Sequence, residues 1–230
     1  MRPDAETSSA ADTLSERAAA RVEADILSGA LAPDSRLGIA ETAARYGVGA
    51  TPLREALSRL AARGLVNAIG QRGFRVKPIS RDDLADIVRI RAVIEREALR
   101  LSMAAGDGAW EGEIVATLHR LKRFVAENRR AFLEGDREFD ALHKNFHTAL
   151  IAACGSPRLL AAHSDLYDQA YRYRRLMMAT FLDAEAFIHE HEGLARMTLE
   201  RSPERAGVAL CAHIASTLNL VYPAAPERAT

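Results

Sequence analysis

The chain has 230 residues, of which 48% are hydrophobic and 27% charged, and its 31 Lys/Arg balance its 31 Asp/Glu. This length and composition are typical of one large globular domain or two small ones. No apolar run is long enough to span a bilayer, and the polar N-terminus is unlike a signal peptide, so we expect a cytoplasmic protein without membrane partners. The two cysteines, Cys154 and Cys211, each lie in an apolar helical pattern and are interpreted as core residues rather than a disulfide or redox pair.

Charge and helical patterning divide the chain in two. Residues 1–81 contain twelve Lys/Arg and nine Asp/Glu, a net +3, whereas residues 82–230 contain nineteen and twenty-two, a net −3. We expect a disordered tail over 1–13, a first domain over 14–77, a linker over 78–81, a second domain over 82–222 and a tail over 223–230. A basic small domain joined to a mildly acidic larger one suits a protein whose two domains bind different partners.

The first domain begins with an expected helix over 14–28 and a proline-containing loop over 31–35. A short helix from Glu41 to Tyr46 then runs into a tight Gly47-Val48-Gly49 turn. The helix that follows, opened by Thr51-Pro52, has one apolar face formed by Leu53, Ala56, Leu57 and Leu60. Two strands, Leu65–Val66 and Phe74–Val76, flank a polar Gly-Gln-Arg-Gly tip. This order predicts a winged helix-turn-helix, whose second helix enters a DNA major groove.

Basic residues are concentrated in the same stretch. From Arg45 to Arg81 there are eight Lys/Arg and one acid, Glu55, so this segment has a net charge of +7. Such an excess is expected where a protein contacts DNA phosphates, although a charged helix face can also be merely solvated.

The string TPLREALSRLAARGLV followed by QRGFRV resembles the DNA-binding domain of the GntR family of bacterial transcription regulators. Arg54 and Gly73 match the family's recognition-helix arginine and wing-tip glycine. Ala40 and Ala50 stand where the family usually has arginines, and Gly49 where it usually has serine, so we expect modest sequence discrimination. The predicted DNA contacts are Arg45, Thr51, Arg54, Arg59, Gln71, Arg72 and Gly73.

The second domain reads almost entirely as helix, interrupted by glycine and proline. The expected helices span 81–105, 109–133, 136–153, 158–181, 184–201 and 203–220. The whole chain is therefore predicted to be mainly α, with an all-α six-helix bundle after the winged helix. This part resembles the helical ligand-binding domain of the FadR-like subfamily.

Four of the seven histidines form a suggestive pattern. His143 and His147 are spaced i, i+4 and share one helix face, and His191 and His213 lie in the last two expected helices. Taken alone, such histidines are more often core or surface residues than ligands. His189 faces away from His191 and is the weaker candidate. Asp140 is a possible partner of His143, although a solvated role is the simpler interpretation.

The strings LHKNFHTALIAACGS, EHEGL and AHIASTL resemble the metal-binding signature of the FCD class of that C-terminal domain. The resemblance implies a divalent cation held by His147, His191 and His213, with His143 where the family frequently has Asp. A site of four nitrogens favours Zn or Ni over Mg or Ca.

The resemblance also implies a small carboxylate effector bound near the metal. Arg91 is the leading candidate to pair with it, although an i, i+4 salt bridge with Glu95 explains Arg91 equally well. Tyr167, Tyr171 and Arg175 repeat at i, i+4, i+8 and could line a pocket, with Tyr171 and Arg175 as further effector candidates, or they simply form a packing stripe.

These observations together predict a regulator that binds double-stranded operator DNA. The resemblance to the GntR family further implies a homodimer and, as for most of its members, a repressor. One alternative is a regulator for which the metal itself is the signal. Another is a metalloenzyme with a DNA-binding head, but the chain has no HExxH arrangement and no convincing base beside the histidines.

Overall fold

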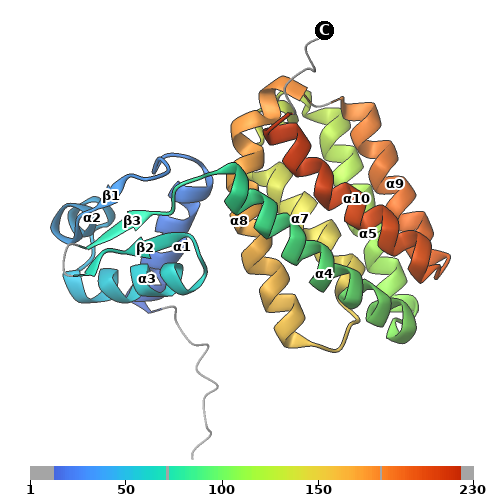
Figure 1. Ribbon diagram of the computed structural model, residues 1–230, viewed down its shortest axis with the longest axis horizontal. Coiled ribbons are helices and arrows are strands. Elements are labelled where there is room, and N and C mark those ends of the chain that lie inside the picture. Colours follow the sequence, from blue (N-terminus) through green and yellow to red (C-terminus); the bar gives the residue numbers. More distant parts are fainter. Residues whose placement is uncertain (1–12, 71–72, 182, 224–230) are drawn as a thin grey trace, which may run out of the picture. The chain divides into compact units, whose positions relative to one another are not determined.

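The computed structural model describes residues 13–70, 73–181 and 183–223 (Figure 1). The chain forms two compact units, Met1–Pro78 and Ile79–Thr230. The expected tails lie outside the described residues except at Thr13 and Pro223, and Thr13 caps the first helix through a capping box with Glu16. Among the described residues, no helix combines the length and apolarity needed to cross a membrane.

The first unit is the expected winged helix-turn-helix. Its elements are α1 (Leu14–Leu27), β1 (Arg36–Leu37), α2 (Ile39–Tyr46), α3 (Ala50–Ala62), β2 (Val66–Ala68) and β3 (Phe74–Val76). The three strands form an antiparallel sheet in the order β1-β3-β2. Strand β1 is too short to give an alternating pattern and was not predicted. Strand β2 begins one residue later than expected, at Val66.

The apolar face that the sequence predicted for α3 packs into the core of this unit. Leu53, Leu57 and Leu60 are at most 1% exposed and belong to the core of this unit. Gly47, between α2 and α3, has a φ of 65°, a left-handed conformation that glycine adopts without steric cost. The tight turn and the buried stripe fix α3 on α1 and α2 and leave its opposite face exposed.

The second unit is a helical bundle, as predicted. Its helices are α4 (Arg81–Ala105), α5 (Gly108–Glu127), α6 (Arg129–Glu134), α7 (Arg137–Ile151), α8 (Pro157–Phe181), α9 (Ala184–Leu199) and α10 (Pro203–Val221). The described residues therefore contain seven helices in this unit rather than six, because the helix expected over 109–133 breaks at Asn128. Both the backbone N–H and the side-chain amide of Asn128 donate to Phe124 O, at 2.8 and 3.3 Å. An asparagine side chain that competes for backbone groups favours such a break.

Helix α7 lies inside the bundle, where it packs against α4, α5 and α8. Helix α10 runs beside α4 and also contacts α8 and α9 (Figure 1). Phe146 and Leu150 of α7 and Ile114 of α5 are fully buried in the shared core. The Trp110 indole N–H donates to Ala149 O at 2.8 Å and ties α5 to α7. The inner faces of α7, α9 and α10 consequently meet away from solvent. Cys154 and Cys211 are both free thiols.

Candidate metal centre and DNA-binding surface

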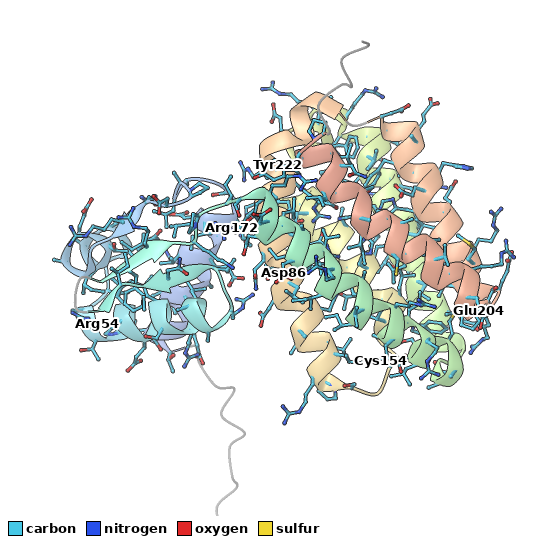
Figure 2. All side chains as sticks on the ribbon, viewed as in Figure 1. Arg54, Asp86, Cys154, Arg172, Glu204 and Tyr222 are labelled. Carbon is cyan, nitrogen blue, oxygen red and sulfur yellow. The ribbon has the colours of Figure 1, made fainter. Side chains whose placement is uncertain are left out.

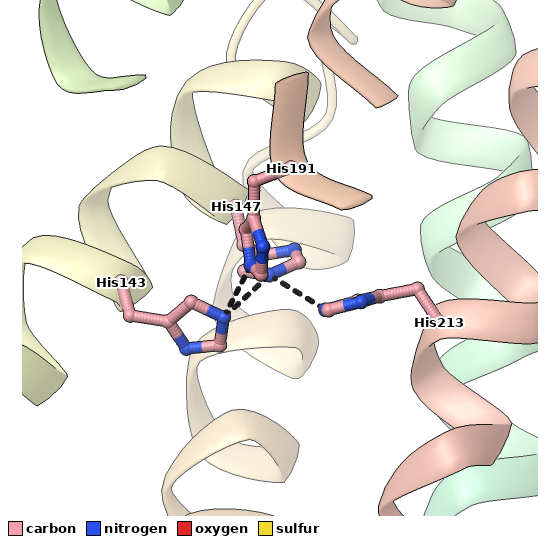
Figure 3. A group of neighbouring side chains, drawn as sticks. All are labelled: His143, His147, His191 and His213. Carbon is pink, nitrogen blue, oxygen red and sulfur yellow. Dashed lines mark hydrogen bonds between the residues drawn. The ribbon is translucent and has the colours of Figure 1, made fainter. Parts of the chain in front are cut away.

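Four histidine side chains from three helices converge in the second unit (Figure 3). His143 and His147 lie one turn apart on α7, His191 comes from α9 and His213 from α10. The first three are at most 3% exposed, and the fourth is partly buried. Their ligand atoms lie within 4.8 Å of one another. The exposed His189 lies outside this cluster.

The four rings approach one another through Nε2. His143 Nε2 lies 2.9 Å from His191 Nε2 and 3.0 Å from His147 Nε2, and His147 Nε2 lies 3.2 Å from His213 Nε2. Neighbouring nitrogens that each lie about 2.1 Å from one metal are separated by about 3 Å. The cluster therefore has the dimensions of a single coordination sphere.

These contacts cannot all be hydrogen bonds. A ring nitrogen has either one hydrogen or one lone pair in the ring plane, so it satisfies one partner. His143 Nε2 and His147 Nε2 each face two other nitrogens, so at most two of the three contacts are hydrogen bonds and at least one close pair is left without one. A divalent cation among the four nitrogens would remove the conflict, because every lone pair could point at it. The donor set thus fits a metal ion.

Three of the four histidines are kept neutral, as metal ligands must be. Burial lowers the pKa of His143, His147 and His191 well below the ordinary value, and the charge of the neighbouring histidines lowers the pKa of each further.

The groups behind the rings orient three of them. His191 Nδ1–H donates to Phe187 O at 2.7 Å, which leaves His191 Nε2 with a lone pair. The Glu190 carboxylate lies 3.0 Å from His213 Nδ1. Two groups meet His143 Nδ1, namely the Tyr167 hydroxyl at 2.7 Å and Arg174 Nη1 at 3.1 Å. Such partners of metal-bound histidines fix the tautomer and the ring orientation.

Asp140 is buried, so the interpretation from the sequence that its side chain is solvated was wrong. Its Oδ1 accepts the Tyr167 hydroxyl at 3.1 Å and lies 3.4 Å from Arg174 Nη2. Burial raises the pKa of Asp140 to about 6, against the lowering effect of the Arg174 charge. Sequence reasoning had singled out Tyr167 as a residue that could line a pocket, but it had favoured Arg175 over the neighbouring Arg174.

Arg91 lies in the bundle interior and makes the ion pair that was the alternative to effector binding. Its Nε donates to Glu95 Oε1 at 2.7 Å, and the two side chains are 2% and 1% exposed. His163 Nδ1 lies 3.1 Å from the same oxygen. Burial alone would raise the pKa of Glu95, but Arg91 and His163 outweigh it and lower the pKa to about 2.

The other two candidate effector residues lie on α8. The hydroxyl of Tyr171 is buried and donates to Gly135 O at 2.6 Å, so it anchors the turn between α6 and α7. Arg175 is half-buried near Tyr171.

On the first unit, α3 presents Thr51 and Arg54 to solvent (Figure 2). Within the described part of the chain, Arg54 makes no ion pair, whereas Arg45 pairs with Asp25 at 3.0 Å and Arg59 with Glu16 at 3.2 Å. Acidic residues from outside the basic stretch thus neutralise part of its +7 charge.

The wing joins β2 to β3. Gly73 has a φ of 99°, and a Cβ there would lie 3.2 Å from Leu37 O, so this position favours glycine. Gln71 and Arg72 lie outside the described residues.

Comparison with known proteins identifies both units. Residues 14–76 match the description "Bacterial regulatory proteins, gntR family", and residues 86–216 match the FCD domain. The chain belongs to the GntR family of transcription regulators. Within this family it combines a GntR helix-turn-helix with an FCD domain.

Two curated GntR-type relatives align along most of their length. The chain is 39% identical to the uncharacterized HTH-type transcriptional regulator BphR of Paraburkholderia xenovorans (strain LB400), over 87% of this chain and 82% of that one. It is 35% identical to the HTH-type transcriptional repressor GlaR of Escherichia coli (strain K12), over 87% of this chain and 92% of that one.

Among solved structures, E. coli McbR/YncC has the same fold, with a TM-score of 0.73 over 92% of this chain and 98% of that one at 20% identity. These GntR matches are regulators rather than enzymes, so this chain is a DNA-binding transcription regulator and the metalloenzyme alternative is discarded.

Proposed function

We propose that this regulator is a repressor whose FCD domain holds a divalent metal ion, zinc or nickel, and binds a small carboxylate as its effector. The observation that supports the proposal is the convergence of four Nε2 atoms from His143, His147, His191 and His213. The bound metal would supply a Lewis-acid centre for an effector oxygen.

The charge of the site favours an anionic effector. Four neutral imidazoles leave the full +2 charge of the cation uncompensated by its ligands. The Asp140 carboxylate accepts a hydrogen bond from the Tyr167 hydroxyl, which links it to His143, and it also forms an ion pair with Arg174. An anion that approached the metal would therefore gain electrostatic attraction in a buried site, where charges interact more strongly than in water.

Arg174 joins Arg91, Tyr171 and Arg175 among the proposed effector-binding residues. The Arg174 guanidinium lies beside His143 and above the rings of Tyr167 and Tyr171, at 4.6 and 5.6 Å from their centroids. Arg174 therefore provides a cation beside His143 that could pair with a carboxylate effector bound at the metal. The Arg91 guanidinium also lies near the Tyr167 ring, at 5.3 Å from its centroid, but its ion pair with Glu95 restricts it.

The protein is proposed to act as a homodimer through the exposed apolar side chains of α4 and α10. Ile90, Val93 and Val208 are 42%, 67% and 66% exposed on these neighbouring helices. Exposed apolar side chains grouped on one surface favour association. A symmetric dimer would present two α3 helices to the two halves of a palindromic operator. On this proposal, DNA is contacted by Arg45, Thr51, Arg54, Arg59, Gln71, Arg72 and Gly73.

The experiment starts from DNA sequences that the zinc-loaded protein selects from a random library. Fluorescence anisotropy then gives the affinity for a selected site with zinc, with chelator, and with zinc plus each member of a panel of small carboxylates. Metal content is measured on the same preparations. The proposal expects about one ion per chain, as the one histidine cluster found among the described residues implies, and weaker DNA binding with one class of carboxylate only when metal is bound.

Two results would redirect the proposal. A change of DNA affinity with zinc alone, and none with any carboxylate, would favour the metal itself as the signal. Protein prepared without chelators that contains no metal and gains none on addition of zinc or nickel would reduce the cluster to packed histidines.

A further inference from the structure

His143 can act as a ligand only in one of its two neutral forms. A neutral imidazole has a single hydrogen, so Nε2 offers a lone pair to a metal only when Nδ1 has the hydrogen. That Nδ1–H is buried, because His143 is 3% exposed, and a buried donor without an acceptor is destabilising. The residue that accepts this hydrogen therefore decides whether His143 is ready to bind.

Two groups lie at hydrogen-bond distance from His143 Nδ1, and they have opposite effects. Arg174, at 3.1 Å, can only donate, so it favours the form with a bare Nδ1 and a hydrogen on Nε2. The Tyr167 hydroxyl, at 2.7 Å, can accept. Among the described residues, Tyr167 is thus the acceptor for the metal-binding form of His143.

The hydroxyl hydrogen of Tyr167 has its own acceptor. Asp140 Oδ1 lies 3.1 Å from the hydroxyl oxygen, and Arg174 Nη2 lies 3.4 Å from the same carboxylate oxygen. Donation from a hydroxyl to a carboxylate is a charge-assisted hydrogen bond. Once Tyr167 donates to Asp140, its oxygen is turned to His143 as an acceptor, and Arg174 is drawn to the carboxylate.

The position of the Tyr167 ring is fixed by packing. The side chain is fully buried on α8, and the Lys144 ammonium and the Arg91 and Arg174 guanidiniums lie 5.6, 5.3 and 4.6 Å from the ring centroid. Cations at this range attract the ring face. The hydroxyl is therefore held between His143 and Asp140 rather than free to swing.

We propose that Tyr167 is a positioning residue for the metal site: its hydroxyl accepts the Nδ1–H of His143, donates to Asp140, and keeps His143 in the form whose Nε2 binds the metal. This inference rests on the proposed metal site. It extends that site by assigning the side chains that select the tautomer of one ligand.

The main test compares zinc affinities by competition with a chromogenic chelator. Tyr167→Phe removes the acceptor and keeps the ring, so zinc should bind about 10–100-fold more weakly, the usual cost of losing such a partner. Tyr173→Phe is the matched control, because Tyr173 is also fully buried on α8 and donates to a carboxylate, Asp83, at 2.7 Å. The control should bind zinc as the wild type does.

A spectroscopic measurement separates positioning from packing. In zinc-loaded protein labelled with ¹⁵N-histidine, the Nδ1–H of His143 should be strongly hydrogen-bonded and slow to exchange in the wild type and in Tyr173→Phe. In Tyr167→Phe the same signal should lose its hydrogen-bond shift and exchange quickly. If Tyr167→Phe destabilises the metal-free domain, Asp140→Asn serves as the second variant and should weaken zinc binding in the same direction by a smaller factor.

The outcomes distinguish this inference from the proposed function. Wild-type protein that binds no zinc would overturn the metal site and the inference together. A wild type that binds zinc, with Tyr167→Phe equal to it in affinity, would overturn the inference alone. Weaker binding by Tyr167→Phe with an unchanged His143 signal would also overturn it, because the loss would then come from packing.

Discussion

Replacing Arg91 by methionine tests whether this arginine stabilises the bundle or serves only to bind an effector. Arg91 and Glu95 form an ion pair of 2.7 Å in which the side chains are 2% and 1% exposed. Arg91→Met keeps most of the side-chain volume but leaves the Glu95 carboxylate buried with His163, at 3.1 Å, as its remaining ion-pair partner in the described part of the chain. Removing one partner of a buried pair strands the other charge away from water.

The expected loss is about 3–5 kcal/mol of unfolding free energy, the typical cost of breaking a buried pair. The pKa of Glu95 gives a similar size, because its lowering from 4.5 to about 2 corresponds to roughly 3 kcal/mol in favour of the carboxylate. The sign follows from linkage. A lowered pKa contributes stability that is present above pH 4.5 and is lost as the pH falls towards 2, so the pair is fully effective at pH 7.

The assay is thermal and urea unfolding of metal-free protein at pH 7, followed by circular dichroism. For a domain of this size, the thermal midpoint of Arg91→Met should fall by about 6–20 °C. The double variant Arg91→Met/Glu95→Leu should recover most of the loss, because it removes both charges. A single variant as stable as the wild type would refute the reasoning and favour a role for Arg91 in effector binding alone.

The remaining predictions concern metal, pH and DNA. Chelation should lower the thermal midpoint. Alanine at His147, His191 or His213 should abolish the stabilisation by zinc, whereas His189→Ala, at an exposed position, should retain it. Metal-free protein should lose unfolding free energy as the pH falls below about 6.5, by up to about 4 kcal/mol per pH unit if His143, His147 and His191 protonate only on unfolding. The raised pKa of Asp140 acts in the opposite direction and reduces this loss. Urea midpoints that stay constant from pH 7 to 5 would contradict the prediction. Arg54→Ala should cost about 1–3 kcal/mol in binding of a selected DNA site, measured by anisotropy. A variant that binds both the selected site and random DNA as tightly as the wild type does would remove Arg54 from the contacting set. Wild-type affinity should fall with salt with a log–log slope of about −0.9 per neutralised phosphate, and a flat response would exclude phosphate contact as the main contribution.

Local patterns in the sequence determined much of this protein. The spacing of Leu53, Leu57 and Leu60 predicts a helix with one buried face, and the structure places that face in the core. The i, i+4 spacing of His143 and His147 requires the two side chains to share one side of α7. Helical periodicity, turn glycines and the position of prolines depend on neighbours in the chain, so they can be inferred without knowledge of the packing.

Other features depended on contacts between distant segments. His143 meets His191 across 48 residues, and His147 meets His213 across 66. Only the packing of α9 and α10 against the interior helix α7 brings these four rings together. The helix break at Asn128 is a different case, because it follows from a local competition for Phe124 O that apolar periodicity does not reveal.

The surroundings of the histidines were decided by tertiary structure alone. Nothing in the sequence distinguishes Asp140 from a solvated aspartate. Its burial beside Tyr167 and Arg174 depends on how α8 packs against α7. Arg174 rather than Arg175 approaches His143 because adjacent residues on a helix point about 100° apart. The sequence alone therefore determined which residues are able to bind a metal. The packing of the bundle determined which side chains hold those residues in place, because hydrogen bonds between helices depend on three-dimensional proximity.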